Sequence, residues 1–120
     1  MVVVEDDLLI AMDIEMQVAA GGHHVVATAT CADEAVAVVL RTRPDVVLMD
    51  LRLARGTSGI DAARRLHERD GTRCIFLSGN VDPATARSLE PLAPVAVLSK
   101  PFQPAMLQQA LGGVPRRPEP

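Results

Sequence analysis

Short apolar runs alternate with amphipathic stretches along the chain. The runs are rich in Val, Ile and Leu and lie at residues 2–4, 24–29, 45–49, 74–77 and 95–98. Runs of this length, bounded by turn residues, predict β-strands. They are nearly continuous rather than alternating with polar residues, so we expect strands buried on both faces, as in a parallel sheet.

The stretches between these runs predict five helices. They lie at residues 7–20, 31–41, 59–69, 83–90 and 104–111, with Pro83 and Pro104 suited to a first turn. In the first helix, apolar residues recur at spacings of three and four, which predicts a buried face. These residues are Leu9, Met12, Met16 and Ala19, and Gly21-Gly22 ends the helix.

The other helices carry similar local signals. Thr30 is expected to cap the second helix, with Asp33 three residues later forming a pair like a capping box. The inward side of the third helix is expected to comprise Ala62, Ala63 and Leu66, and that of the last helix Leu107, Ala110 and Leu111.

The order of elements is therefore (βα)5, an α/β chain. Right-handed crossovers between parallel strands make it a doubly wound, five-stranded parallel sheet. In such a sheet, ligands bind outside the carboxyl ends of the strands. The length of 120 residues allows one domain, which we expect at residues 1–112. The Pro-rich remainder, 113–120, is expected to be a disordered tail or linker stub.

Composition excludes several classes of protein. Two Phe and no Tyr or Trp argue against a module that stacks nucleic-acid bases, and a net charge of −3 argues against binding to a phosphate backbone. Two cysteines, Cys31 and Cys74, are too few for a disulfide framework, so we expect buried thiols. Neither a membrane span nor a signal peptide is evident. We therefore expect a cytoplasmic protein that does not contact a membrane.

Polar residues follow four of the predicted strands. They are Glu5-Asp6-Asp7, Asp50, Ser78-Gly79 and Lys100-Pro101. Because these strand ends meet at one edge of the sheet, we expect the side chains to converge. Clustered carboxylates repel one another, and a hard cation such as Mg²⁺ relieves that repulsion. Together with a lysine and a hydroxyl, they predict a site that binds a phosphoryl group.

The ordered motifs resemble the receiver domain of two-component response regulators. The motifs are Val3-Val4-Glu5-Asp6-Asp7, Arg43-Pro44-Asp45-Val46-Val47-Leu48-Met49-Asp50-Leu51, Gly59-Ile60-Asp61, Phe76-Leu77-Ser78-Gly79 and Lys100-Pro101-Phe102. Any one of them is weak, but the ordered set is specific and spans residues 2–111. The resemblance implies a flavodoxin-like fold and a phosphoprotein in signal transduction.

The resemblance assigns roles at the acidic site. Asp50 would be the phospho-acceptor, taking a phosphoryl group from a histidine kinase or a histidine phosphotransfer protein. Mg²⁺ would be bound by Asp6 and Asp50 directly, by Glu5 through a water and by the backbone carbonyl of Arg52. Asp7 is expected to cap the following helix.

Further roles carry over to the other strand ends. Ser78 and the Gly79 amide would bind the phosphoryl group, and Lys100 would pair with Asp50 before transfer. A cis peptide is expected before Pro101. At Val97 the family usually has Tyr or Phe, so the resemblance does not extend to the family's usual switch through an aromatic ring.

Three functions stay open. The first is a receiver that assists only its own phosphorylation and dephosphorylation, and is otherwise not an enzyme. It would act through an unknown downstream protein, without a DNA-binding domain in this chain; the resemblance also allows a homodimer through the last helix–strand–helix face. The second is a Mg²⁺-dependent phosphohydrolase with an aspartyl nucleophile, disfavoured because Arg52 stands where such enzymes have a second Asp. The third is a phosphorylation-independent scaffold of the same fold. His23, His24 and His67 are expected to be solvated.

Overall fold

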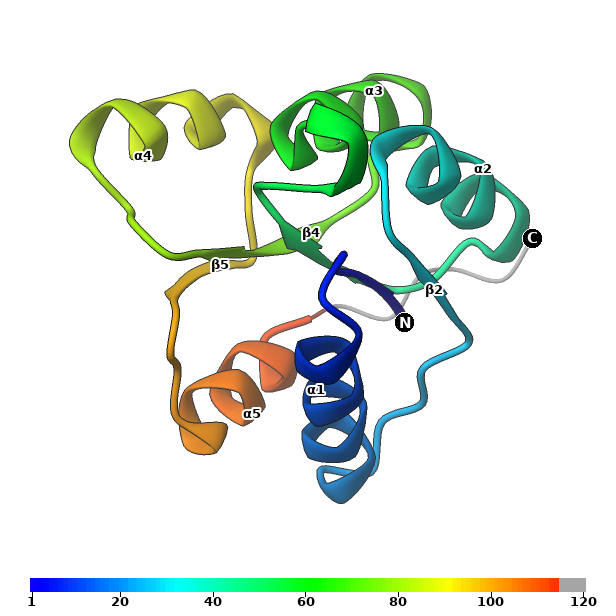
Figure 1. Ribbon diagram of the computed structural model, residues 1–120, viewed down its shortest axis with the longest axis vertical. Coiled ribbons are helices and arrows are strands. Elements are labelled where there is room, and N and C mark those ends of the chain that lie inside the picture. The colour runs from blue at the N-terminus through cyan, green and yellow to red at the C-terminus, as the bar shows by residue number, and fades with distance from the viewer. Residues whose placement is uncertain (115–120) are drawn as a thin grey trace.

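A parallel β-sheet runs through the middle of the computed structural model, which describes residues 1–114 (Figure 1). The strand order is β2-β1-β3-β4-β5, and every pair is parallel. The strands are β1 (Val2–Val4), β2 (Ala27–Ala29), β3 (Val47–Asp50), β4 (Cys74–Ser78) and β5 (Ala96–Ser99). The predicted doubly wound five-stranded parallel sheet is confirmed.

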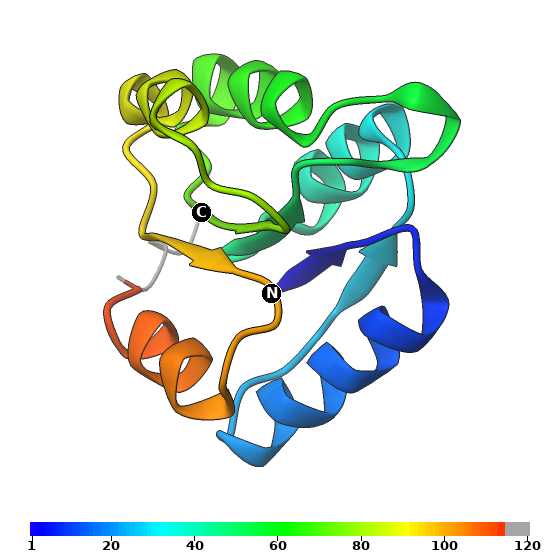
Figure 2. The ribbon, with the colours of Figure 1, turned by 60° about the vertical axis from the view of Figure 1, so that its left-hand side comes forward.

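Helices cover both faces of this sheet. One face carries α1 (Leu8–Ala20) and α5 (Pro104–Gly112), and the other carries α2 (Ala32–Thr42), α3 (Gly59–Asp70) and α4 (Pro83–Leu89) (Figures 1 and 2). Short 3₁₀ turns lie at η1 (Ala54–Gly56) and η2 (Glu90–Leu92). Successive strand residues point to opposite faces, so the core forms two clusters. Val4 and Met49 belong to the α2–α3 side, and Val3 and Leu48 to the α1–α5 side.

The prediction for the buried face of α1 is wrong. Leu9, Met12 and Met16 are exposed, and the helix instead buries Ala11, Ile14 and Val18. Both sets have the spacing of three and four that marks one side of a helix. Because α1 is apolar on nearly all sides, its local pattern does not specify which side packs against the sheet.

The predicted cap of α2 is also wrong. Cys31 occupies the cap position without a side-chain bond, and the free N–H of Ala32 donates to Thr57 Oγ1 at 3.1 Å. Thr57 lies in the loop between β3 and α3, far along the chain. The Thr30 amide donates instead to Glu34 Oε1 at 3.1 Å. A side chain from another element thus supplies the bond that a local capping residue was expected to make.

The remaining expectations have mixed outcomes. The inward side of α3 is buried, and on α5 Leu107 and Leu111 are buried while Ala110 is half-buried. Both cysteines are buried. The second strand is shorter than predicted, since its pairing with β1 covers only Ala27–Ala29.

The three histidines differ in their exposure to solvent. His23 and His24 are exposed, as expected, but His67 is half-buried and its Nδ1 atom is enclosed without a hydrogen-bond partner. Within residues 1–114, no helix has the length and apolar character to cross a membrane. Most of the predicted tail, residues 115–120, lies outside the described residues.

Candidate functional site

The carboxyl edge of the sheet carries a polar cleft of about 740 Å³. The parallel strands end there together, so residues distant in the chain become neighbours. Its lining includes the strand-end residues that the sequence singled out: Glu5, Asp6, Asp50, Arg52, Ser78, Gly79 and Lys100. Convergence of these side chains, predicted from the strand order, is present in the structure.

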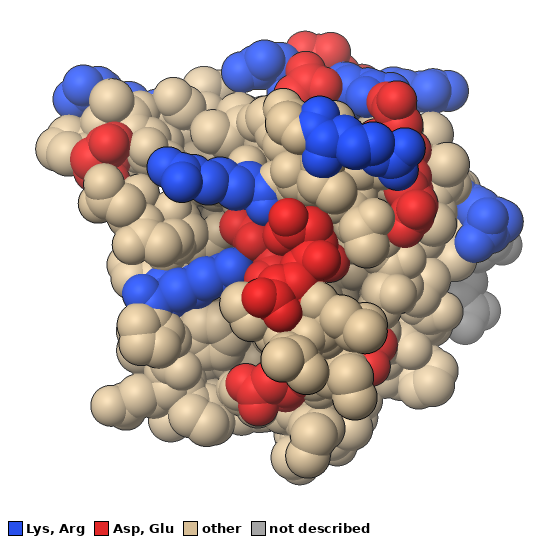
Figure 3. All heavy atoms as spheres, viewed as in Figure 1, with Lys and Arg blue, Asp and Glu red and all other residues tan. Residues whose placement is uncertain are grey.

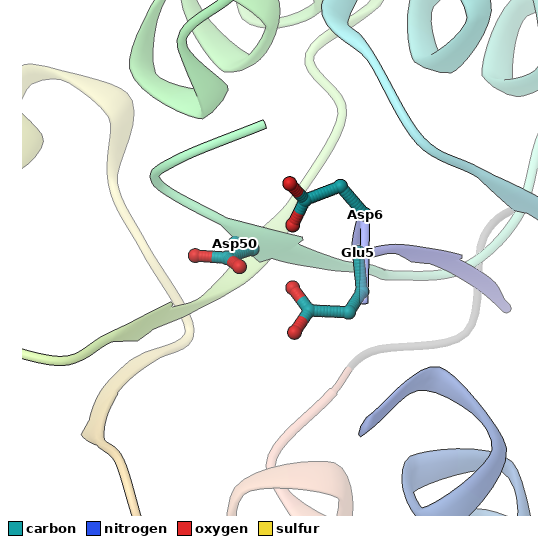
Figure 4. A group of neighbouring side chains, drawn as sticks. All are labelled: Glu5, Asp6 and Asp50. Atoms are coloured by element: carbon teal, nitrogen blue, oxygen red, sulfur yellow. The ribbon is translucent and has the colours of Figure 1, made fainter. Parts of the chain in front are cut away.

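Three carboxyl groups form the centre of the cleft. Oxygen atoms of Glu5, Asp6 and Asp50 lie within 4.8 Å of one another, and Figure 4 shows the three side chains pointing toward a common space. Glu5 and Asp50 are only 3% and 7% exposed, whereas Asp6 is exposed. When like charges are buried in this way, either a cation compensates them or one of the groups takes up a proton.

Lys100 supplies one such positive charge. Its Nζ donates to Asp50 Oδ2 at 2.9 Å and to Glu5 Oε1 at 3.1 Å. The sequence predicts the contact with Asp50, but not that with Glu5. The peptide bond between Lys100 and Pro101 is cis, as expected.

The shared lysine affects the two carboxyl groups differently. Burial and the neighbouring Asp50 raise the pKa of Glu5 to about 8, despite the opposing effect of Lys100. Burial alone would also raise the pKa of Asp50, but its hydrogen-bonding neighbours outweigh burial and hold that pKa below its ordinary value. Burial lowers the pKa of Lys100, but its bonds to the two carboxyl groups have the larger, opposite effect. The pKa of Lys100 therefore lies above its ordinary value. Asp50 is therefore the more readily ionised of the two buried acids.

The donor set fits a hard divalent cation. Glu5 Oε2 is buried and accepts no hydrogen bond. Within this part of the structure one lysine contacts two of the three carboxyl groups, so a single ammonium leaves charge uncompensated when all three are ionised. Carboxylate oxygens with free coordination sites are what Mg²⁺ takes as ligands.

Backbone groups and helix ends complete the rim of the cleft. The Arg52 amide donates to Asp50 Oδ1 at 3.2 Å, which orients that carboxylate. Asp7 Oδ1 accepts from the amides of Leu9 and Ile10 at 3.0 and 3.2 Å, so the predicted capping role is confirmed.

Ser78 lines the cleft but is bonded within its own loop. Its hydroxyl donates to the Asn80 carbonyl at 3.0 Å and accepts from the Asn80 amide at 3.2 Å. Asp82 and Thr85 also line the cleft, and sequence reasoning did not single them out. Asp82 directly precedes Pro83 and caps α4 by accepting from the Thr85 amide at 2.7 Å. In the sequence, an Asp-Pro pair soon after a predicted strand is the signal that could have identified Asp82 as a helix cap at the rim of the cleft.

Val97 lies outside the cleft. It is half-buried on β5, pairs in register with Phe76 and packs against the core on the α2–α3 side.

The surface around the cleft also places acidic side chains at the centre and basic side chains beside them. Figure 3 shows an acidic patch in the middle of one face, flanked by Lys and Arg side chains. The region of α1 and α5 below it is mainly uncharged.

The fold and the site can be compared with known proteins. The family model of the response regulator receiver domain matches residues 1–112. The chain belongs to this family. Receiver domains serve signal transduction in two-component systems. The match extends over all the strand-end residues described above.

Individual relatives agree with this assignment. The phyllosphere-induced regulator PhyR of Methylorubrum extorquens is 37% identical over 91% of this chain and 42% of that protein. The solved anti-anti-sigma factor PhyR of Bartonella quintana is 32% identical, with a TM-score of 0.75 over 93% of this chain and 45% of that one. This receiver therefore spans less than half the length of both. CheY in the CheX-CheY-BeF3-Mg complex of Borrelia burgdorferi, 20% identical, shares the fold with a TM-score of 0.85 over 92% and 84% of the chains.

Proposed function

We propose that Asp50 accepts a phosphoryl group from the phosphohistidine of a kinase or a phosphotransfer protein. The observation that supports this most strongly is the convergence of Asp50 with Glu5, Asp6 and Lys100 in a single cleft. The Asp6 and Asp50 carboxylates and the Arg52 carbonyl would hold Mg²⁺, with Glu5 acting through a water. When bound, Mg²⁺ neutralises the carboxylates and withdraws charge from the phosphoryl oxygens.

The nucleophile is the ionised carboxylate of Asp50, whose pKa lies below its ordinary value. One of its oxygens forms a bond to phosphorus while the bond from phosphorus to the donor imidazole breaks, and the imidazole keeps the bonding pair. The Arg52 amide holds the other carboxylate oxygen in place. Lys100, 2.9 Å from Asp50 before transfer, then neutralises charge on the phosphoryl oxygens.

Ser78 and Gly79 complete the proposed phosphoryl site. To reach a phosphoryl oxygen, the Ser78 hydroxyl must give up its bond to the Asn80 carbonyl. This exchange of one hydrogen bond for another is the local conformational change that we propose to follow phosphorylation. Val97 offers no aromatic ring to follow that change, so signalling would proceed through altered contacts with a downstream protein.

We propose sigma-factor control as the class of pathway. The PhyR protein of Bartonella quintana, to which this chain is similar, is an anti-anti-sigma factor, and it is more than twice as long as this chain. The receiver would supply the phosphorylation input. Water would later hydrolyse the acyl phosphate, so the domain assists its own phosphorylation and dephosphorylation without acting on a separate substrate.

Mass spectrometry of the intact chain tests this function. With acetyl phosphate and Mg²⁺, we expect the added mass of one phosphoryl group, and no addition when EDTA removes the metal. Asp50→Asn should abolish the addition. Asp61→Asn is a matched control, because that carboxylate is exposed on α3. An unmodified wild type, or a modified Asp50→Asn variant, would contradict the proposal.

The same reaction separates the two alternative functions. A phosphohydrolase would release inorganic phosphate continuously and in large excess over protein. A phosphorylation-independent scaffold would show neither modification nor release. The proposed receiver gives at most slow turnover, limited by hydrolysis of its own acyl phosphate.

A further inference from the structure

Arg52 differs from the other proposed Mg²⁺ ligands because it would use its backbone carbonyl. A side-chain ligand can change its rotamer to meet a metal, but a backbone carbonyl moves only with the loop that carries it. That loop joins β3 to α3, and its tip, which includes Arg55 and Gly56, is exposed to solvent. The affinity for the metal therefore depends on what fixes this surface loop.

The loop doubles back on itself, so that Arg52 pairs with Ser58 in an antiparallel bridge. The hydrogen bonds of this bridge are made by the flanking residues, and on one side the Leu53 amide donates to the Thr57 carbonyl at 3.1 Å. Arg52 therefore turns its own peptide groups away from Ser58. Its amide donates to Asp50 Oδ1 at 3.2 Å, which places those groups on the side of the cleft.

The Thr57 hydroxyl ties this loop to α2. It donates to the Ala54 carbonyl at 2.8 Å within the loop, and it accepts from the Ala32 amide at 3.1 Å at the start of the helix. Ala32 is buried and belongs to the core on the α2–α3 side, so its amide is a firm anchor. One side chain thus joins the exposed loop to a packed helix, which lies beside it in Figure 2.

Two further hydrogen bonds join the loop to the start of α2. The Ala54 amide donates to the Thr30 carbonyl at 2.9 Å, and the Arg55 guanidinium donates to Cys31 Sγ at 3.4 Å. Both of them hold the 3₁₀ turn at the tip of the loop. Thr57, in contrast, bonds to α2 through its hydroxyl and to the strand that carries the metal ligand through its carbonyl.

We propose that Thr57 is a positioning residue that raises the affinity of the cleft for Mg²⁺ by holding the Arg52 carbonyl in place. This inference rests on the proposed metal site and adds a residue that does not itself touch the metal. Loss of the hydroxyl would leave the Ala32 amide without its partner and release the loop from α2. Groups that orient metal ligands typically change metal affinity by about 10- to 100-fold.

The Mg²⁺ dissociation constant of the intact chain tests the proposal. Titration with MgCl₂, followed through the ¹⁵N NMR signals of amides around the cleft, measures it without a phosphoryl donor. Thr57→Val keeps the shape of the side chain but lacks the hydroxyl, so we expect the dissociation constant to rise about tenfold. Thr57→Ser keeps the hydroxyl and should bind Mg²⁺ nearly as the wild type does. If the valine variant does not fold, Thr57→Ala removes the same hydroxyl.

Ser58→Ala is a matched control in the same loop. The Ser58 hydroxyl caps α3 by accepting from the amides of Ile60 and Asp61 at 3.2 and 3.4 Å. Loss of this cap should lower the thermal midpoint of unfolding. It should leave the Mg²⁺ dissociation constant unchanged, because the cap does not connect the loop to α2. The control therefore separates positioning of the ligand from general loss of stability.

The rate at which acetyl phosphate modifies Asp50 gives a second measurement. In Thr57→Val, the Mg²⁺ concentration needed for the half-maximal rate should rise about tenfold, in line with the weaker binding. The rate at saturating Mg²⁺ should match that of the wild type, because Thr57 acts through the metal and not on the nucleophile.

Several results would overturn the role of Thr57. These are an unchanged dissociation constant in Thr57→Val, no recovery in Thr57→Ser, or an equal rise in Ser58→Ala. A reduced rate at saturating Mg²⁺ would assign Thr57 to the nucleophile instead of the metal. Failure of the proposed function looks different, since the wild type itself would then show no Mg²⁺-dependent shifts or no modification of Asp50.

Discussion

Two clusters in this receiver each place one cation between two acids. In the cleft, Lys100 lies 3.1 Å from Glu5 and 2.9 Å from Asp50. Between α2 and α3, Arg65 lies 3.0 Å from Asp33 and 3.8 Å from Asp61. Only their surroundings differ greatly: the side chains of Glu5 and Asp50 are 1% and 10% exposed, against 87% and 56% for Asp33 and Asp61.

Burial therefore distinguishes the two clusters more than the number or spacing of charges does. Water screens the charges around Arg65, so such pairs contribute little to stability. In the cleft, removal from water raises the pKa of Glu5 while Asp50 stays ionised. The same arrangement of one cation between two acids forms part of the candidate phosphoryl site in the cleft and only a surface contact between α2 and α3.

Removal of the cation from the cleft should have the largest effect. We expect Lys100→Ala to lower the free energy of unfolding by about 3 kcal/mol at pH 7 in EDTA, because two buried carboxyl groups lose their partner. Urea denaturation followed by circular dichroism measures this. If Lys100→Ala lowered the free energy of unfolding no more than Arg65→Ala does, burial would not explain a difference in stability between the two clusters.

Addition of a metal should act on the cleft alone. At a Mg²⁺ concentration a hundred times its dissociation constant, stability should rise by about 2.7 kcal/mol. Thermal unfolding at increasing Mg²⁺ measures the gain. Asp6→Asn should remove most of it, and Asp33→Asn, which changes an exposed acid of the other cluster, should leave it intact. Equal gains in the two variants would contradict a metal site in the cleft.

The raised pKa of Glu5 predicts a dependence of stability on pH. Its folded pKa of about 8 lies above the ordinary value of 4.5, so between these values the folded state binds more protons than the unfolded state. The free energy of unfolding should therefore fall as pH rises from 5 to 8 in EDTA.

Glu5→Gln should flatten this decline, because glutamine does not titrate. Urea denaturation at pH 5, 6, 7 and 8 compares the two proteins. Mg²⁺ should also flatten the decline in the wild type, since the cation stabilises the ionised carboxylate. A decline of the same slope in Glu5→Gln would assign it to another group.

The smallest effect is expected at the exposed cluster. Arg65→Ala should change the free energy of unfolding by less than about 1 kcal/mol, and high salt should reduce the change further. Urea denaturation at low and high NaCl measures both. A loss comparable to that of Lys100→Ala would indicate that this cluster holds α2 and α3 together.

The local pattern determined much of this protein. Continuous apolar runs predicted the parallel sheet, and the polar residues after them predicted a site at its carboxyl edge. Residues such as Asp50 and Lys100 could be located in this way because the topology of a parallel sheet brings strand ends together whatever the details of packing.

Only the tertiary structure decided which neighbours these residues have. The sequence did not reveal that Lys100 also contacts Glu5, that Thr57 caps α2, or that α1 packs through Ile14 rather than Met12. Periodicity within a helix reflects contacts three or four residues apart, and two faces of α1 satisfy it equally. The choice between them depends on the shape and burial offered by strands elsewhere in the chain, which no local spacing encodes.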